Sequence, residues 1–421
     1  MEIRVRPEEC GRIQEFIDQC SENGGGKVIL EKGTYVSGTL CLKDGVTLYL
    51  ERGALLLGSG DIGDYPDNAS CFTDAVGHKR GKALICAFGA DGIGLEGEGV
   101  VDGRGGEFPP EHPDHLIRPF LVRLVECRNV SVKGIGLRQS AAWCLHIQDS
   151  VGVRVEDISI FNRCNGNNDG IDIDGCSDVR IENCMIDSGD DALCLKSTSN
   201  HSCRNIRIKG CQVTTNWAGF KIGTESVGDF EDIEVSGCTF YDVKGCAVKV
   251  VPVDGGNVRG LYLHDLVMHN CTGPVFFSTG ERLRQYFDVR RQQPGSMEQV
   301  RLERIRVHAV SARGGTYEGR PWGNAKGCIV LSGLKEYPLK DFLIKDCEFS
   351  MPGGMGEGPR GPVPEMGVQY PEFHLFDPLP CWGIYVRHGQ NIVFENIRME
   401  KRGEDARPMA CAEDAENVVG I

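Results

Sequence analysis

The sequence predicts an all-β chain folded as a single-domain, right-handed parallel β-helix with a short capping helix at its N-terminus. Three observations lead to this fold class: a repeat of about 25 residues, three short apolar runs in each repeat, and one amphipathic helical segment ahead of the repeats. With 56 glycines in 421 residues, the composition also favours many tight turns over long helices.

Short strand-like segments recur along the middle of the chain. Each opens with Asn, Asp or Gly and then alternates apolar and polar side chains, which is the period of a β-strand. Their starts are 23, 26, 27, 27 and 25 residues apart, too close for the blades of a β-propeller, which need about 40 residues. Two further apolar runs follow in each repeat, so each repeat predicts one three-stranded coil that buries its inner face by stacking on its neighbours. The six starts are Asn129, Gly152, Asp178, Asn205, Asp232 and Asn257.

Residues 1–26 are expected to form a cap over the first coil, because an open strand edge would otherwise aggregate. A helix is expected within this cap, ended by the glycine run 24–26, and the first strand is expected to begin at Lys27. The apolar face of this helix consists of Ile13, Phe16, Ile17 and Cys20.

The coils are expected to cover about residues 27–400, with 401–421 as a C-terminal tail. Two Gly/Pro-rich loops, 311–327 and 351–374, interrupt the later coils. Long loops in a compact fold often carry function, so these loops are candidates for the wall of a binding groove, with variable insertion as the alternative. No linker or boundary interrupts the pattern, so 1–421 is predicted as one domain.

Composition narrows the classes of partner. The formal net charge of −14 argues against nucleic acid and anionic lipid, and no apolar run is long enough for a membrane span. The start MEIRVRPEEC lacks a basic segment followed by an apolar one, so we expect a cytoplasmic protein, or an extracellular or periplasmic one if a leader has been removed. The 20 cysteines show no C-x-x-C spacing and are expected to be small reduced core residues.

Carboxylates cluster at matching places in two neighbouring repeats. Asp169 lies in one repeat, and Asp190 and Asp191 lie in the next, 21 residues further along. Because stacked coils are about 4.8 Å apart, we expect the three side chains to lie side by side on the outer surface. Crowded carboxylates cannot all ionise cheaply, and glycoside hydrolysis needs one protonated acid beside one ionised base. The alternatives are a calcium site or a row of turn-stabilising Asp residues.

The motif Asn167-Asn-Asp-Gly-Ile-Asp, followed one repeat later by Gly189-Asp-Asp-Ala-Leu-Cys-Leu-Lys, resembles glycoside hydrolase family 28, the polygalacturonase family. The resemblance covers roughly residues 10–280, including the segments GGGKVIL, KGTYVSGTL and ERGALLLGS, and is weaker to about 400. It implies hydrolysis with inversion, with Asp190 as the general acid and with Asp169 and Asp191 holding and deprotonating the attacking water. Inversion further implies acid and base carboxyls about 6.5–9.5 Å apart.

The chain departs from the polygalacturonase pattern at two positions. Ala218 stands where the family has the His of a Gly-His-Gly segment, and Ala247 stands where it has the Arg of an Arg-Ile-Lys segment. Lys249 remains and is a substrate-binding candidate, but a lone Lys is a point charge that cannot grip a carboxylate in two places. The resemblance therefore favours rhamnogalacturonan hydrolases of the same family, which place a neutral rhamnose beyond the cleaved bond.

Four further side chains are candidates for substrate binding. Trp143 and Trp217 offer aromatic faces for sugar rings, with packing against a loop as the alternative. Strand alternation turns Lys221 outward towards the site, and Glu225 follows it in the same segment. The alternative for both is a plain surface charge.

Two polar residues next to the motifs complete the candidates. His201 follows the catalytic repeat in a loop and is a candidate substitute for the missing His, with a solvated loop His as the alternative. Asn167 is expected to support Asp169 or a sugar hydroxyl, with a turn cap as the alternative.

The sequence thus predicts an inverting glycosidase acting on pectin-type oligosaccharides, with rhamnogalacturonan fragments or another α-linked glycoside as substrate and exo action as a hypothesis. It needs no metal and no cofactor, and its partner is an oligosaccharide or polysaccharide. Two other classes stay open: a β-helix polysaccharide lyase that uses calcium with an Arg or Lys base, and a non-catalytic carbohydrate-binding β-helix.

Overall fold

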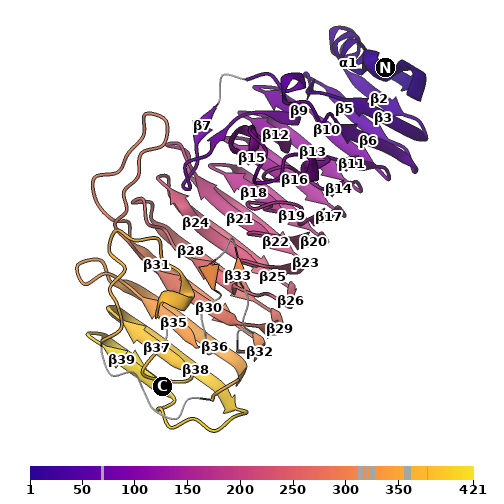
Figure 1. The fold of residues 1–421 in the computed structure, drawn as a ribbon. Coiled ribbons are helices and arrows are strands. Elements are labelled where there is room, and N and C mark those ends of the chain that lie inside the picture. The colour runs from indigo at the N-terminus through magenta and orange to yellow at the C-terminus, as the bar shows by residue number, and fades with distance from the viewer. Residues whose placement is uncertain (68–70, 312–315, 318–319, 322–327, 355–361, 377) are drawn as a thin grey trace. The chain divides into compact units, whose positions relative to one another are not determined.

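The computed structural model describes residues 1–67, 71–311, 316–317, 320–321, 328–354, 362–376 and 378–421. The chain divides into two compact units, Met1–Asp190 (unit 1) and Asp191–Ile421 (unit 2). Both units consist of short parallel strands that follow one another in coils, which confirms the predicted right-handed parallel β-helix (Figure 1). A regular coil contributes a first, a second and a third strand, and each pairs in parallel with the strand of its own kind in a neighbouring coil.

Unit 1 begins the coils. Its first strands are β1 (Glu2–Val5), β2 (Gly26–Leu30), β5 (Val46–Leu50), β10 (Gly94–Gly97), β13 (Arg128–Lys133), β16 (Val151–Glu156) and β19 (Ser177–Glu182). Its second strands are β3 (Gly33–Ser37), β6 (Ala54–Gly58), β11 (Val100–Asp102), β14 (Gly136–Arg138), β17 (Ser159–Asn162) and β20 (Met185–Ser188). Its third strands are β4 (Leu40–Cys41), β9 (Ala83–Phe88), β12 (Phe120–Val125), β15 (Leu145–Gln148) and β18 (Ile171–Asp174). A hairpin of β7 (Phe72–Thr73) and β8 (Lys79–Arg80) and the short helices η2 (Ile62–Asp64), η3 (Gly105–Glu107) and η4 (His115–Ile117) lie between coils.

Unit 2 continues the same pattern. Its first strands are β22 (Cys203–Lys209), β25 (Phe230–Ser236), β28 (Val258–His264), β31 (Met297–Glu303) and β40 (Glu416–Val419), and its second strands are β23 (Gln212–Thr215), β26 (Thr239–Tyr241), β29 (Val267–Cys271) and β32 (Arg306–Ala309). The long strands β36 (Leu339–Met351) and β38 (Gly389–Lys401) run through both positions. Its third strands are β21 (Leu193–Ser197), β24 (Phe220–Ser226), β27 (Cys246–Val250), β30 (Gly273–Ser278), β35 (Ile329–Ser332), β37 (Ile384–Arg387) and β39 (Ala410–Glu413). The hairpin of β33 (Thr316–Tyr317) and β34 (Arg320–Pro321) and the short helix η5 (Phe373–Phe376) complete the unit.

The N-terminal cap contains the predicted helix and one unexpected strand. Helix α1 (Ile13–Glu22) follows the short helix η1 (Pro7–Arg12) and buries the four side chains expected on its apolar face. Strand β1, however, precedes the helix and pairs with β2, so the prediction that the first strand begins at Lys27 is wrong. The approach is so close that a Cβ on Gly26 would stand 1.9 Å from the Met1 carbonyl oxygen, which explains the glycine run. In the described part of the chain, no helix has the length and apolar character of a membrane span.

A left-handed residue opens five of the six predicted repeats. The backbone φ is 51° at Asn129, 73° at Gly152, 57° at Asp178, 53° at Asn205 and 52° at Asp232. Gly has no Cβ to clash in this region, and Asn and Asp tolerate it better than other side chains. The recurring Asn, Asp or Gly of the sequence pattern therefore suits the backbone conformation that opens these coils.

The sixth predicted repeat start, Asn257, is wrong by three residues. Ile233 pairs with Leu261, which sets Gly260 beside Asp232 in the ladder. Gly260 also has the left-handed φ of 71°. The segment Asn257-Val-Arg resembles a repeat opening in sequence, but the strand register makes Gly260 the equivalent residue.

Most third strands in the middle of the chain are buried on both faces. Every residue of β18, β21 and β24 is buried, which is the burial pattern of a covered parallel strand. In unit 1, Phe72 of the β7 hairpin packs on Phe120 and Trp143 over this sheet. In unit 2, Phe373 and other residues of the segment 362–376 pack over it in the same way.

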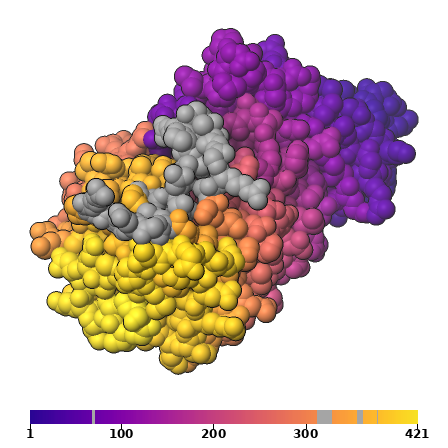
Figure 2. Space-filling model, turned by 60° about the horizontal axis from the view of Figure 1, so that its bottom comes forward, coloured from indigo at the N-terminus to yellow at the C-terminus, as the bar shows by residue number. Residues whose placement is uncertain are grey.

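The C-terminal segment 401–421 is not a tail, contrary to prediction. Strand β39 pairs with β37, and β40 pairs with β38, both in parallel. In the space-filling view the last coils form one continuous yellow surface (Figure 2). The coils therefore continue to Val419. Of the two predicted loops, 311–327 lies mostly outside the described residues, and 351–374 is described at 351–354 and 362–374.

The cysteines are thiols, and most are buried among the strands. Burial raises the pKa of Cys164 to about 11 and that of Cys271 to about 12. A buried thiol with a raised pKa is unreactive at neutral pH, which agrees with the predicted role as small core residues.

Candidate active site

Buried asparagines fix the backbone that carries Asp169 and Asp190. The Asn168 amide donates to the Ser140 carbonyl oxygen at 2.9 Å, and the Asn168 carbonyl accepts from the backbone N–H of Asp190 at 3.2 Å. The Asn162 amide donates to the Asp169 carbonyl oxygen at 2.9 Å. Both asparagines are fully buried, so water does not compete for these bonds. The motif around Asp169 therefore sets the position of both acids.

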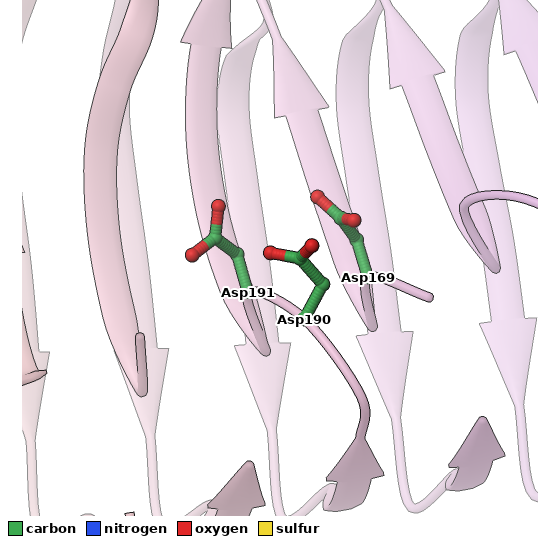
Figure 3. Close-up of side chains that lie close together, drawn as sticks. All are labelled: Asp169, Asp190 and Asp191. Carbon is green, nitrogen blue, oxygen red and sulfur yellow. The ribbon is translucent and has the colours of Figure 1, made fainter. Parts of the chain in front are cut away.

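The structure brings the three predicted catalytic carboxylates together (Figure 3). One carboxylate oxygen from each of Asp169, Asp190 and Asp191 lies within 4.8 Å of those of the other two. Figure 3 shows Asp190 between its two neighbours. Asp190 is 7% exposed, against 2% for Asp169 and Asp191, so the middle carboxyl is the most accessible to a substrate.

Lys221 holds Asp191 in a buried ion pair. Its Nζ donates to Asp191 Oδ2 at 2.5 Å and to the Tyr370 hydroxyl at 3.0 Å. Burial lowers the pKa of Lys221, but Asp191, Tyr370 and Cys194 together outweigh it, with Asp191 the largest of the three, and the pKa lies well above its usual value. An ammonium bound so closely also disfavours a metal ion on the same Asp191 oxygen, because like charges repel.

Lys249 lies opposite Lys221 in the parallel ladder and points the same way. Its Nζ is 2.7 Å from Glu372 Oε2 and lies over the rings of Tyr370 and Trp217, at 5.1 and 5.7 Å from their centroids. Burial lowers the pKa of Lys249, but Glu372, Tyr370 and Asp191 together raise it more, so the net shift is upward. Both lysines are therefore held charged inside the protein.

Glu225 lies in a second buried ion pair of unit 2. Its Oε2 is 3.5 Å from Lys196 Nζ. Burial raises the pKa of Glu225, while Lys196, Lys221 and Arg282 lower it, and the net result is a pKa of about 2. This carboxylate is ionised at every physiological pH. The structure thus shows Glu225 as part of the cation cluster around Lys221.

Three residues of this cluster escaped the sequence prediction. Arg282 donates to Asp254 Oδ1 at 2.9 Å and lies 5.8 Å from the Tyr370 ring centroid. Tyr370 and Glu372 belong to the Gly/Pro-rich loop 351–374, whose unusual length was the signal available for them. Arg282 carries no comparable signal, because it follows β30 in a segment without repeat character.

Arg80 of unit 1 is a further unpredicted residue next to the acidic motifs. Its Nε donates to Asp74 Oδ2 at 2.7 Å, and its Nη2 donates to Asn167 Oδ1 at 3.2 Å. Its guanidinium lies 5.8 Å from the Trp143 ring centroid. Arg80 thus links the β8 hairpin to the motif that carries Asp169, and Asn167 acts as its acceptor.

The remaining predicted binding residues lie in different surroundings. Trp217 is half-buried, and Lys249 lies over its ring. Trp143 is 3% exposed and packs edge-on against Phe120, so the contacts that the structure shows for it are core contacts. His201 is exposed after β21, and its carbonyl oxygen accepts from Ser197 Oγ at 2.9 Å. A substrate role for these three residues stays a prediction.

Comparison with known proteins places this geometry in a family. The chain is 25% identical over 293 residues to a probable polygalacturonase of Vitis vinifera, covering 64% of this chain and 59% of the relative. It is 26% identical over 292 residues to an endo-polygalacturonase of Pectobacterium carotovorum subsp. carotovorum, covering 63% and 71% of the two chains. The chain thus spans about three fifths of the length of the Vitis relative.

Solved structures share the fold at low identity. A hyperthermoactive exopolygalacturonase from Thermotoga maritima superposes with a TM-score of 0.73 at 19% identity, covering 94% of this chain and 92% of that one. A family 28 exopolygalacturonase from Yersinia enterocolitica gives 0.75 at 16%, covering 99% and 78%. The family model for glycosyl hydrolases family 28 matches residues 69–315, more than half of the chain and the whole of both acidic motifs. The chain therefore belongs to glycosyl hydrolases family 28.

Proposed function

We propose that this protein is an inverting glycoside hydrolase that cleaves an α-linked bond in pectin-type oligosaccharides, including fragments of rhamnogalacturonan type. The observation that carries the proposal is the cluster of Asp169, Asp190 and Asp191, whose oxygens lie within 4.8 Å of one another in a family 28 chain. The relatives from Vitis and Pectobacterium bear the name polygalacturonase, which supports pectin as the source of the substrate.

The three carboxyls take different parts in the reaction. Asp190, the most accessible, donates a proton to the oxygen of the leaving sugar. Asp169 and Asp191 hold a water and accept its proton as it attacks the anomeric carbon. Lys221 keeps Asp191 oriented through the 2.5 Å ion pair, so the base is in place before substrate binds.

The distances between the carboxylates bear on whether the reaction inverts or retains the anomeric configuration. The oxygens lie closer than the 6.5–9.5 Å expected between the acid and base carboxyl groups of inverting enzymes. Inversion is supported instead by the presence of a third carboxylate. Two carboxylates beside the acid can share one water, whereas retention needs a single carboxylate nucleophile.

Exo action is the finer part of the proposal. The segment 362–376 brings Tyr370 and Glu372 onto the lysine pair, which supports a binding groove blocked at that end. An exo enzyme releases short products from a chain end from the first turnovers. A ladder of mid-sized oligomers from a long polymer would contradict this part of the proposal.

The test is turnover of homogalacturonan and rhamnogalacturonan oligosaccharides, followed by proton NMR of the newly formed reducing end. We expect the first product to carry the β-anomer, opposite to the α-linkage cleaved, and Asp190→Asn to abolish turnover. A first product with the α-anomer would reject inversion, and unchanged turnover in Asp190→Asn would reject the assigned acid. An unsaturated product absorbing in the near ultraviolet would instead identify a lyase.

A further inference from the structure

The Lys249 ammonium has a compensated charge but unused hydrogen-bond donors. The side chain is 1% exposed, and Glu372 Oε2 stands 2.7 Å from its Nζ. Among the described residues, no acceptor meets hydrogen-bond geometry with that Nζ. A buried ammonium with unpaired N–H groups is suited to bind an oxygen atom of a ligand, because a buried donor without an acceptor costs free energy.

The residues that follow Glu372 in sequence hold its backbone in place. Phe373 and Phe376 follow it in η5 and pack against Phe276, at ring-centroid distances of 5.9 and 5.3 Å. These rings belong to a buried hydrophobic cluster of unit 2. The backbone that carries Glu372 therefore cannot move away from Lys249 without disturbing that cluster.

The neighbouring cations are also paired with acids of the protein. Lys221 contacts Asp191 at 2.5 Å, and Arg282 contacts Asp254 at 2.9 Å. A free carboxylate that enters next to Lys249 would meet Glu372 as a like charge, with its attraction to the lysine already balanced. An uncharged oxygen meets no such opposition.

From this arrangement we infer that Glu372 makes the Lys249 site select a sugar without a free carboxylate: a neutral sugar, or a uronic acid whose carboxyl is esterified. The inference rests on the proposed function, because it names the substrate class of the same site. Hydroxyl or ester oxygens accept from the free N–H groups of Lys249, and the Trp217 ring beside that ammonium offers an apolar face to the sugar. Glu372 is then a specificity residue supplied by the loop 351–374.

Two matched oligosaccharide probes test the effect of the carboxylate charge of the substrate alone. A homogalacturonan trisaccharide and its fully methyl-esterified form share sugars and linkages and differ in carboxylate charge. We expect the unmodified protein to prefer the ester at least tenfold in kcat/KM. Glu372→Gln, which removes one charge at nearly constant shape, should shift the ester-to-acid ratio at least tenfold towards the free acid.

Controls separate the charge from its side effects. Glu336→Gln removes an exposed carboxylate and should leave the ratio unchanged. Glu372→Gln loses the counter-ion of a buried lysine, so its thermal unfolding is measured as well. The double variant Lys249→Met with Glu372→Gln removes both charges and should lose the gain in free-acid preference. A gain that persists in the double variant would overturn the inference.

Binding measurements make the outcome independent of turnover. In an Asp190→Asn background, calorimetry with the same two probes should show the same tenfold shift on adding Glu372→Gln. A binding shift without turnover in the enzyme that retains Asp190 would reject the proposed hydrolysis and keep the specificity. An unchanged ratio with turnover intact would overturn the specificity alone, and no binding of either probe would overturn it as well.

Discussion

Glu225 offers a stability prediction whose size follows from its surroundings. Burial and the nearby Lys196, Lys221 and Arg282 together move its pKa from 4.5 to about 2. One pKa unit corresponds to 1.36 kcal/mol, so this pKa difference stabilises the folded protein by about 3 kcal/mol at neutral pH. Because the folded-state pKa is depressed, the stabilisation is complete above about pH 4.5 and is lost as the pH falls towards 2.

The perturbation is Glu225→Gln, read by urea unfolding at several pH values. The variant should lose about 3 kcal/mol at pH 7, and the loss should shrink to about 2 kcal/mol at pH 3.5, because Glu225 protonates in the unfolded chain at that pH while it stays ionised in the folded protein. The exposed Glu336→Gln is the control and should change stability by less than about 0.5 kcal/mol at both pH values. A loss that is equal at pH 7 and pH 3.5, or below about 1 kcal/mol at pH 7, would refute the electrostatic reasoning.

Four further variants test the site and the coil. Asp169→Asn should lower kcat by about 10²–10⁴ in the oligosaccharide assay with little change in KM, and a retained kcat would remove it from the reaction. Lys221→Met should lower kcat at least tenfold while circular dichroism stays unchanged, and full activity would show that the ion pair is dispensable. Arg80→Gln strands a buried carboxylate and should cost about 3–5 kcal/mol in urea unfolding, against little for the exposed Lys79→Gln; equal losses would contradict this. Gln299→Gly relieves a left-handed φ of 57° and should stabilise by about 0.5–1 kcal/mol, whereas a lower urea midpoint would show that this conformation costs nothing there.

The coils and the three acids could be predicted because both depend on residues that repeat. Asn129 and Asp178 mark coil openings through a backbone conformation that few side chains tolerate, so Asn, Asp or Gly is favoured there. The spacing of Asp169 and Asp190 then follows from one coil of chain. The error at Asn257 has the same origin, since a short apolar–polar alternation matched the pattern three residues before the true left-handed Gly260.

The partners of the site lysines could not be predicted in the same way. Lys221 and Lys249 are one coil apart on equivalent strands, so their register follows from the repeat. Their counter-ions do not follow from the repeat. Asp191 lies in the coil before Lys221, whereas Glu372 comes from a loop more than a hundred residues after Lys249. Nothing in the local sequence around Lys249 indicates a carboxylate from that loop. A buried charged side chain implies an oppositely charged partner, but only the folded structure shows which residue that partner is.

Lys249 is the last lysine in the row of paired outward positions, and it marks the end of the proposed sugar-binding surface. Lys221 pairs with Lys249, and Lys249 pairs with Phe276, so equivalent outward positions change from ammonium to aromatic within three coils. Phe276 is fully buried because Phe373 and Phe376 cover it. Under the proposed function, polar contacts with a sugar should therefore stop at Lys249, because the segment that also carries Glu372 covers the next coil. If the proposed specificity holds, one loop sets both the length of the binding surface and the charge that it accepts, so shortening that loop should change chain-end preference and charge preference together.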